Sequence, residues 1–467
     1  MKRETNNKRN WIVLNALFLV LAVVIAINLY VTGGAPAKSP EAAALPAEAS
    51  AIPAEAQENA PSAAETPTLP EATPEPEATP EPEAEAKTGT QDFSMRFVGD
   101  LMCCDYQMAD ALQADGTYDF TKHLAQIKNE LQGADVLLGN FEACMYSGAP
   151  LNGTIVGFNA PLDYAKALKE CNFDVLFTSN NHAMDFLVPG AFETTQKLRD
   201  TGFVALGTNL TKEDVGSVYI RDVRGVPVAI LAYTARTNKY KLELDGEDAS
   251  WVMNYYSAER VAADVKTARE LGAKVIVMYL HEGTEKDTEP DRRQLAAANE
   301  SFAAGVDAVI MSHTHSLQKM EKRMVTVDGV EKPVFVAYSL GNFMSSAIHS
   351  ESLNNIILNL DFTYDWDQDR LTSIDASYVL TYTYNYYNDQ KIMSFSIVPL
   401  EQALADFSMV DSRTRYKQDR FQSAYDKIMK RIGVDAAEDV FTFHPDSVQT
   451  PAPTAEQTPV AGSSPTP

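Results

Sequence analysis

The sequence predicts an α/β fold whose chemistry lies at the ends of its strands. Six short apolar runs are separated by helical stretches, a pattern typical of buried parallel strands. Each run ends in a polar cluster, and four of the chain's seven histidines fall in these clusters. Because ligands of open α/β sheets bind outside the carboxyl ends of the strands, we expect the clusters to converge. The runs and their clusters are Phe97-Val98 into Gly99-Asp100, Val136-Leu137-Leu138 into Asn140-Phe141-Glu142, Val175-Leu176-Phe177 into Asn180-Asn181-His182, Val275-Ile276-Val277 ending at His281, Val309-Ile310-Met311 ending at His313-Thr314-His315, and Val334-Phe335-Val336 into Ser339-Leu340-Gly341-Asn342.

The stretches between these runs predict helices. Pro189 stands at the start of one of them, where its missing N–H costs nothing. Ser257 is a suitable N-cap for a helix that ends at Gly272. Helices are expected over 160–171, 189–199, 257–272 and 290–304, and strands over 174–178, 274–280 and 307–312.

The pattern changes after about residue 353, where antiparallel strands are expected over 356–358, 376–383 and 392–398. Residues 381–387 carry four tyrosines. A half-buried sheet face is the favoured reading of this stretch, and a recognition platform is the alternative. Residues 413–432 predict a polar amphipathic helix docked on the surface.

Residues 1–32 are predicted to form a cytoplasmic N-terminus and a transmembrane anchor. Four basic residues precede an apolar stretch from Trp11 to Val31, which is about 21 residues and long enough to span a bilayer. The positive flank places the N-terminus in the cytoplasm and the rest of the chain outside it, in a bacterial cell membrane with a single pass. A cleaved signal peptide is the alternative, because Ala35-Pro36-Ala37 resembles a cleavage site.

Residues 33–92 are predicted to be a disordered linker, and residues 447–467 a disordered tail. The linker is rich in Ala, Pro and Glu, and the hexamer Glu-Ala-Thr-Pro-Glu-Pro occurs twice in tandem. Such a segment buries too little apolar area to offset its ordering entropy, and proline and like charges keep it extended. The globular part is therefore expected over 93–446, divided into a main portion at 93–352 and C-terminal strands and a helix at 353–446 that complete it.

The charge of the chain argues against nucleic-acid binding. The net charge is −25, of which about −17 lies on the expected globular part, so no basic footprint is present. An anionic substrate must then be bound by a local positive charge, which a metal centre would supply.

The four cysteines are Cys103, Cys104, Cys144 and Cys171. Buried free thiols are the favoured reading, and a disulfide from Cys103 or Cys104 to Cys144 is the alternative.

The strand-end clusters predict a divalent-metal site. They offer two carboxylates, one amide and three imidazoles, a mixture that suits Mn, Zn or Fe and is enough for one or two metals. His313 and His315 point to the same side if the chain there is extended, as two ligands require. The predicted metal ligands are Asp100, Glu142, Asn181, His281, His313 and His315.

Each cluster also has a simpler reading. The histidines at 313 and 315 can face solvent or contact substrate only, and the polar residues at 181 and 182 can cap a turn. Asp100 and Glu142 can be ordinary charges at strand ends, and Glu285 can be an acidic side chain near a helix N-terminus. The combination is stronger than any single member.

The ordered motifs resemble those of the CapA family, also called PgsA-type proteins, which take part in capsule and poly-γ-glutamate synthesis. The resemblance covers about 95–350. The matching motifs are Gly99-Asp100-Leu101-Met102, Asn140-Phe141-Glu142, Asn180-Asn181-His182-Ala183-Met184-Asp185, His281-Glu282-Gly283-Thr284-Glu285, Ser312-His313-Thr314-His315 and Tyr338-Ser339-Leu340-Gly341-Asn342-Phe343.

The resemblance implies a calcineurin-like metallophosphatase fold, which is a layered β-sandwich flanked by helices with a dinuclear metal site. It implies the six metal ligands named above and His182 as the acid that protonates a leaving group. Glu285 is predicted to orient a ligand or the substrate. Substrate contacts are expected from Asn140, Asn180, Asp185, Ser339 and Asn342.

The chain departs from the metallophosphatase pattern at several positions. Met102 stands where the first motif usually has a second ligand, a histidine, and Glu142 replaces the bridging aspartate. Glu282 and Lys286 replace the Trp and Tyr that often occur in the fourth motif of the CapA family. The loss of the histidine weakens one metal position and puts full dinuclear catalysis in question.

Two functions follow as hypotheses. The first is an exported metal-dependent hydrolase or transferase that acts on a phosphoester or a polymer bond. The second is a non-catalytic accessory protein that binds an anionic capsule polymer through the metal site. In both, the expected partners are an anionic capsule polymer or phosphoester substrate, membrane-embedded polymer synthase components and the membrane through the N-terminal helix, with no nucleic acid.

Overall fold

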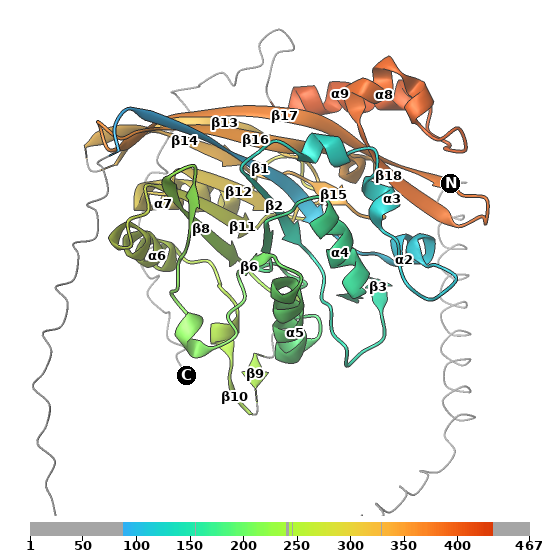
Figure 1. Ribbon diagram of the computed structural model, residues 1–467, viewed down its shortest axis with the longest axis horizontal. Helices are drawn as coiled ribbons and strands as arrows, with labels where there is room; N and C mark the ends of the chain where they lie inside the picture. Colours follow the sequence, from blue (N-terminus) through green and yellow to red (C-terminus); the bar gives the residue numbers. More distant parts are fainter. Residues whose placement is uncertain (1–86, 155, 240–241, 245, 328, 433–467) are drawn as a thin grey trace, which may run out of the picture. The chain divides into compact units, whose positions relative to one another are not determined.

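The computed structural model describes residues 87–154, 156–239, 242–244, 246–327 and 329–432 (Figure 1). The predicted anchor, all but the end of the predicted linker and the predicted tail lie outside these residues. Within the described ranges, no helix combines the length and the hydropathy that crossing a membrane requires.

The first of two large sheets has eight strands, in the order β18-β17-β16-β1-β2-β5-β6 with β15 pairing beside β1. Strands β1, β2, β5 and β6 run parallel to one another, whereas β16, β17 and β18 extend the sheet in antiparallel fashion on the other side of β1. The strands are β1 (Thr90–Leu101), β2 (Val136–Phe141), β5 (Val175–Phe177), β6 (Val204–Leu206), β15 (Asn342–Met344), β16 (Asn354–Asp365), β17 (Arg370–Tyr387) and β18 (Met393–Pro399).

The second sheet has six strands, in the order β13-β14-β12-β11-β8-β7. Its central strands β8, β11, β12 and β14 are parallel, and an antiparallel strand lies at each edge. The strands are β7 (Tyr219–Val223), β8 (Val226–Thr234), β11 (Val275–His281), β12 (Ala308–Ser312), β13 (Met320–Val327) and β14 (Val330–Ala337). Two short ribbons lie apart from the sheets: β3 (Asn152–Thr154) with β4 (Gly157–Asn159), and β9 (Glu243–Leu244) with β10 (Glu247–Asp248).

The two sheets pack against each other through one apolar core to which both contribute. Phe177 of β5 and Tyr279 of β11 stack across this core with ring centroids 4.3 Å apart. A second apolar cluster covers the outer face of the eight-stranded sheet, and a third joins α6 and α7 to the six-stranded sheet. The helices are α2 (Asp105–Ala111), α3 (Thr121–Leu124), α4 (Leu162–Glu170), α5 (Leu187–Asp200), α6 (Ala258–Glu270), α7 (Arg292–Ala304), α8 (Leu400–Ala405) and α9 (Gln418–Ile432) (Figure 1).

All six apolar runs form strands, and the predicted α/β class is confirmed. Ser257 caps α6 by accepting a hydrogen bond from the Arg260 N–H. The predicted helix at 413–432 begins only at Gln418, because Thr414 instead forms an antiparallel bridge with Tyr386. Tyr382 and Tyr384 are buried and pack against Phe421 of α9, so part of the tyrosine stretch is a buried sheet face. The four cysteines are free and buried.

A buried carboxylate, that of Asp110, links the α2–α3 segment to β18. We expect the protein to lose stability in acid when this carboxylate is protonated. Asp110 accepts hydrogen bonds from Ser394 Oγ at 2.6 Å and Asn388 Nδ2 at 2.9 Å, and its Oδ2 lies 2.8 Å from His123 Nε2. Burial would raise the pKa of Asp110, but these contacts, led by that with His123, lower it to about 2. Because the folded pKa is below the unfolded one, the stabilisation is complete above about pH 4 and is lost as the pH falls toward 2.

The expected stabilisation by Asp110 is about 2 kcal/mol at neutral pH. Urea unfolding at pH 3 and pH 6 should show that Asp110→Asn reduces the difference in stability between the two conditions by about 1 kcal/mol. Asp200→Asn, at an exposed position on α5, is the matched control and should leave that difference intact. An unchanged pH dependence in the Asp110 variant would contradict this reading.

Candidate metal centre

The carboxyl ends of strands from both sheets bring the predicted ligands together. Asp100 is the penultimate residue of β1, Glu142 directly follows β2, and Asn181 follows β5. His281 ends β11, and His313 and His315 follow β12. One ligand atom from each of Asp100, Glu142 and His281 lies within 4.8 Å of the others. The sequence-based expectation that these clusters converge is therefore met.

One group of side chains consists of Asp100, Glu142 and His315. His315 Nδ1 lies 3.0 Å from Asp100 Oδ2, and His315 Nε2 lies 3.6 Å from Glu142 Oε1. Asn140 Nδ2 donates to Asp100 Oδ1 at 2.8 Å and to Glu142 Oε2 at 3.0 Å. The amide thus holds two buried carboxylates next to each other.

A second group consists of Asn181, His281 and His313. His281 Nε2 lies 2.9 Å from Asn181 Oδ1 and 3.0 Å from His313 Nδ1. The same His281 atom lies 4.0 Å from Glu142 Oε1. Glu142 therefore stands between the two groups, where one carboxylate can serve both.

Glu142 is the side chain whose surroundings point most directly to a cation. Its Oε1 is buried and has no hydrogen-bond partner among the described residues. Buried polar atoms are nearly always paired, so this oxygen calls for an explanation, and an ion is one. Imidazole nitrogens and carboxylate oxygens surround it, which is the donor set of Zn, Mn or Fe sites. These residues fit a divalent metal.

The pKa values of these side chains show how the buried charges of the site interact. Burial, followed by the charge of Asp100, raises the pKa of Glu142 well above its usual range. Burial lowers the pKa of His281 well below normal and that of His313 to about 3, so both rings are neutral near pH 7. Burial disfavours the charged form of His315 as well, but the charges of Glu142 and Asp100 outweigh it and raise its pKa to about 10. The neutral rings are ready to donate lone pairs.

The turn that carries the two histidines is conformationally strained. His313 has φ of 98° and His315 has φ of 54°, both in the left-handed region that non-glycine residues seldom adopt. Thr314 Oγ1 secures the turn by donating to Ser316 O at 2.7 Å, and it lies 2.9 Å from Ser339 Oγ, which can donate to it. Such strain costs about 1–3 kcal/mol per residue and persists mainly at functional sites. The turn, and not an extended segment as predicted, directs both rings to the site.

Gly99 allows β1 to approach the segment that precedes β15 closely. A Cβ at position 99 would lie 1.9 Å from the carbonyl oxygen of Gly341, which also accepts from the Asp100 N–H at 2.9 Å. Because backbone atoms cannot move aside cheaply, Gly99→Ala should lower the free energy of unfolding by about 1–3 kcal/mol. Gly157→Ala is the control, because its Cβ would come no closer than 3.6 Å to any atom. Urea denaturation measures both, and equal stabilities would refute the role of this close approach.

The predicted acid, His182, is held by a carboxylate. His182 Nδ1 lies 2.7 Å from Asp185 Oδ2, which also accepts from the Phe158 N–H at 2.9 Å. The Phe158 ring packs edge-on against the imidazole, with centroids 4.6 Å apart. The Asp185 carboxylate at Nδ1 holds the ring in place, and Nε2, which lies 3.4 Å from Asn238 Nδ2, is the atom placed to exchange a proton.

The remaining predicted residues occupy different positions around the centre. Asn342 Oδ1 lies 2.8 Å from His315 Nδ1 and orients that ring together with Asp100. Asn180 Nδ2 donates to Asn140 Oδ1 at 3.1 Å and to Phe141 O at 2.9 Å, so its side chain braces the strand ends. Ser339 lies fully buried under the histidine turn. Glu285 is exposed, and its charge contributes to raising the pKa of Glu142.

The sequence reasoning missed the loop after β8. Arg236 Nη2 lies 2.6 Å from His313 Nε2, and the Asn238 N–H donates to Asn181 O at 2.7 Å. Strand β8 is a seventh apolar run that ends in Arg236-Thr237-Asn238, so the rule applied to the other six runs would have found this loop. Ser312, which hydrogen-bonds to Asp100 Oδ1, was also missed as a functional side chain.

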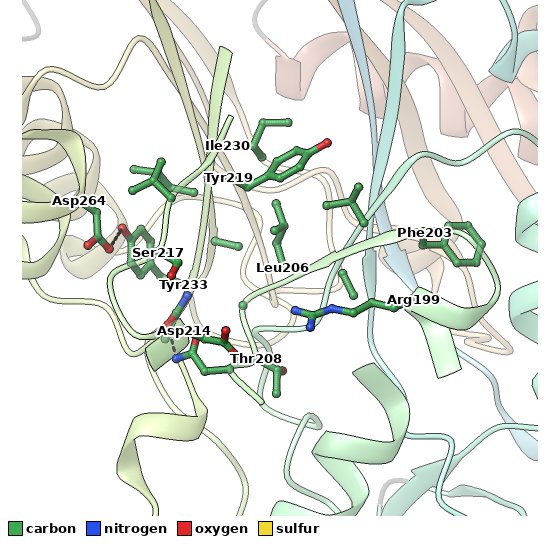
Figure 2. Close-up of a pocket in the computed structure, with 18 residues that line it drawn as sticks. Arg199, Phe203, Leu206, Thr208, Asp214, Ser217, Tyr219, Ile230, Tyr233 and Asp264 are labelled. Carbon is green, nitrogen blue, oxygen red and sulfur yellow. Dashed lines mark hydrogen bonds between the residues drawn. The ribbon is translucent and has the colours of Figure 1, made fainter. Parts of the chain in front are cut away.

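A separate cavity of about 450 Å³ opens at the edge of the sheets (Figure 2). Leu206 of β6, Tyr219 of β7 and Ile230 of β8 lie along it, and Tyr233 Oη donates to Asp264 Oδ2 at one side. None of the predicted site residues lines this cavity. We assign it no part in the chemistry of the metal centre.

Comparisons with known proteins agree with the motif analysis. The family described as bacterial capsule synthesis protein PGA_cap matches residues 94–347, which is more than half of the chain. The chain is 27% identical over 261 residues to the capsule biosynthesis protein CapA of Bacillus anthracis, covering 54% of this chain and 60% of that protein. It is also 27% identical over 275 residues to the PGA biosynthesis protein CapA of Bacillus subtilis strain 168, covering 56% and 65%. The chain thus spans less than two thirds of the length of these relatives.

Among solved structures, the calcineurin-like phosphoesterase YfkN of Bacillus subtilis aligns with 73% of this chain and 98% of its own. The identity is 13% and the TM-score is 0.37. A similarity at this level gives no information about the metal centre.

Proposed function

Because the chain belongs to the family of bacterial capsule synthesis proteins, we propose that it is a metal-dependent hydrolase acting in capsule or poly-γ-glutamate synthesis, export or anchoring. The substrate is an anionic phosphoester or a bond of the polymer itself. The observation that carries this proposal is the unpartnered, buried Oε1 of Glu142 between two groups of imidazole and carboxylate ligands.

The ligand sets suggest how one or two divalent ions, Mn, Zn or Fe, would be held. Asp100, Glu142 and His315 would hold one ion, and Glu142, Asn181, His281 and His313 the other. When bound, such ions polarise the scissile bond and lower the pKa of water. The chain itself supplies His182 Nε2 as the proton donor to the leaving group, with Asp185 keeping the ring oriented. Asn140 and Asn180 keep the strand ends in register around the carboxylates.

We further propose that the predicted N-terminal anchor and linker place this centre outside the cell at the membrane. There an anionic polymer and the membrane-embedded components of its synthase would be its partners. The capsule biosynthesis and PGA biosynthesis named for the two CapA relatives support this location.

A non-catalytic role is the second candidate, and one observation favours it. Met102, which stands where the metallophosphatase motif has a histidine, is buried in the apolar cluster on the outer face of the eight-stranded sheet. The group of Asp100, Glu142 and His315 thus lacks one imidazole, and an ion there would be held more weakly. In this case the remaining strong position would bind the polymer without cleaving it.

Metal content and turnover distinguish the two candidates. The purified full chain should bind at least one Mn or Zn ion by elemental analysis and hydrolyse bis-p-nitrophenyl phosphate or poly-γ-glutamate only when loaded. Metal bound tightly without turnover on either substrate would favour the accessory role. A folded protein that binds no divalent metal would refute both.

A further inference from the structure

We propose that Arg236 is the oxyanion-binding residue of this centre and receives a phosphate or carboxylate group of the substrate. This inference rests on the proposed function, because it assumes that a divalent ion occupies the adjacent ligands. It assigns substrate recognition to a loop that none of the six predicted motifs contains.

Arg236 lies at the rim of the centre, where a ligand can reach it. Its side chain is 34% exposed, although its Nη2 lies 2.6 Å from His313 Nε2. Nη2 also donates to the Gly283 carbonyl at 2.7 Å, and Nη1 lies 3.3 Å from Glu282 Oε1. The guanidinium is therefore fixed on one side by Glu282 and Gly283, and its other side faces the metal ligands.

The contact with His313 is one that a metal would break. A guanidinium has only donors, so His313 Nε2 is the acceptor in its contact with Arg236. The other ring nitrogen, Nδ1, faces His281 Nε2 at 3.0 Å, inside the ligand group. A neutral ring that binds a metal through Nδ1 carries its proton on Nε2 and cannot accept from Arg236. The freed Nη2 donor then needs an acceptor, and an oxygen of an anionic substrate supplies one.

The charges around the centre make such a cation necessary. Asp100, Glu142, Asp185 and Glu285 all lie in or near it, and the globular part of the chain is strongly acidic. Arg293 is also close, but it contacts Glu282 Oε1 at 3.4 Å and Asp291 Oδ2 at 2.7 Å, so its charge is largely compensated. Of these two guanidinium groups, Arg236 has the fewer carboxylate partners and lies beside His313, so it is placed to draw an oxyanion toward the ligands.

The test is a pair of calorimetric titrations on the full chain. Mn²⁺ is titrated first, and then inorganic phosphate or, separately, glutarate is added to the Mn-loaded protein. In Arg236→Ala the Kd for the oxyanion should rise about tenfold or more, because a charge-assisted contact is lost. The Kd for Mn²⁺ should stay the same or fall, since the competitor for His313 is removed. The probe that wild type binds more tightly identifies phosphate or carboxylate as the recognised group.

Arg293→Ala is the matched control. It removes the same charge and a contact to the same Glu282 oxygen, but among the described residues it makes no hydrogen bond or ion pair with a metal ligand. It should change the oxyanion Kd by no more than about twofold, and circular dichroism should show both variants folded. Unchanged oxyanion binding in Arg236→Ala, or no oxyanion binding by the loaded wild type, overturns the inference alone. A weaker Mn²⁺ affinity in that variant also overturns it, because Arg236 would then only brace His313. Wild type that binds no Mn²⁺ overturns the proposed function as well.

Discussion

Replacing Glu142 by glutamine should change stability in opposite directions with and without metal. In metal-free protein the variant should be at least as stable as wild type, because it removes a carboxylate whose buried Oε1 has no hydrogen-bond partner and whose charge is opposed by Asp100. With Mn²⁺ present the variant should lose most of the metal-induced stabilisation, since Glu142 is the carboxylate that both ligand groups share. At 100 times the Kd, an ion that binds only the folded state contributes about 2.7 kcal/mol.

We expect the Mn²⁺ affinity of Glu142→Gln to fall by about 100-fold or more, because even residues behind a ligand contribute about 10–100-fold. Thermal denaturation in EDTA and in Mn²⁺, together with calorimetric titration, measures both effects. Glu270→Gln, at an exposed position on α6, is the control and should leave both the stability in EDTA and the Mn²⁺ affinity unchanged. A Glu142 variant that is destabilised in EDTA and still binds Mn²⁺ normally would show that the carboxylate has a structural role only.

Replacing His182 by glutamine should abolish most turnover while leaving the metal in place. Its Nδ1 is held by Asp185, so its role as a proton donor depends on Nε2, and it belongs to neither of the two ligand groups. Loss of a positioned acid lowers kcat by about 10²–10⁴. The measurement is Mn-dependent hydrolysis of bis-p-nitrophenyl phosphate, with metal content determined on the same samples.

Asp185→Asn should lower kcat to a smaller extent, because the ring loses its charged partner but keeps its place against Phe158. His349→Gln, at an exposed histidine that is none of the proposed site residues, should leave the rate unchanged. If His182→Gln loses metal in proportion to activity, His182 is a ligand and the assignment as an acid is wrong.

The sequence was most informative where a single local rule decided the structure. Apolar runs followed by polar clusters located the ends of β1, β2, β5, β11 and β12, because buried parallel strands must carry apolar side chains on both faces. Ser257 as a helix cap followed from its side-chain chemistry in the same way. The antiparallel extension by β16, β17 and β18 was read from the change of pattern alone.

Features that depend on contacts between distant segments could not be predicted from the sequence. The residues around Ser339 do not reveal that its hydroxyl forms a hydrogen bond with Thr314. Nor does the sequence reveal that the Asn180 side chain donates a hydrogen bond to the Phe141 carbonyl. The left-handed turn at His313 and His315 contacts the segment that precedes β15 through Thr314 and Ser339, and it replaced the extended geometry that spacing suggested. Arg236 was missed because the run that forms β8 was not recognised as a strand with a functional end.

The most direct test of the account is the position of a bound ion. Crystals of the full chain soaked in Mn²⁺ should give an anomalous difference peak about 2.0–2.3 Å from a Glu142 carboxylate oxygen and from the His281 Nε2 atom. A second, weaker peak beside Asp100 and His315 would fit the loss of the histidine at position 102. A well-ordered structure with no peak at Glu142, or with a peak only at a surface carboxylate, would contradict the central claim.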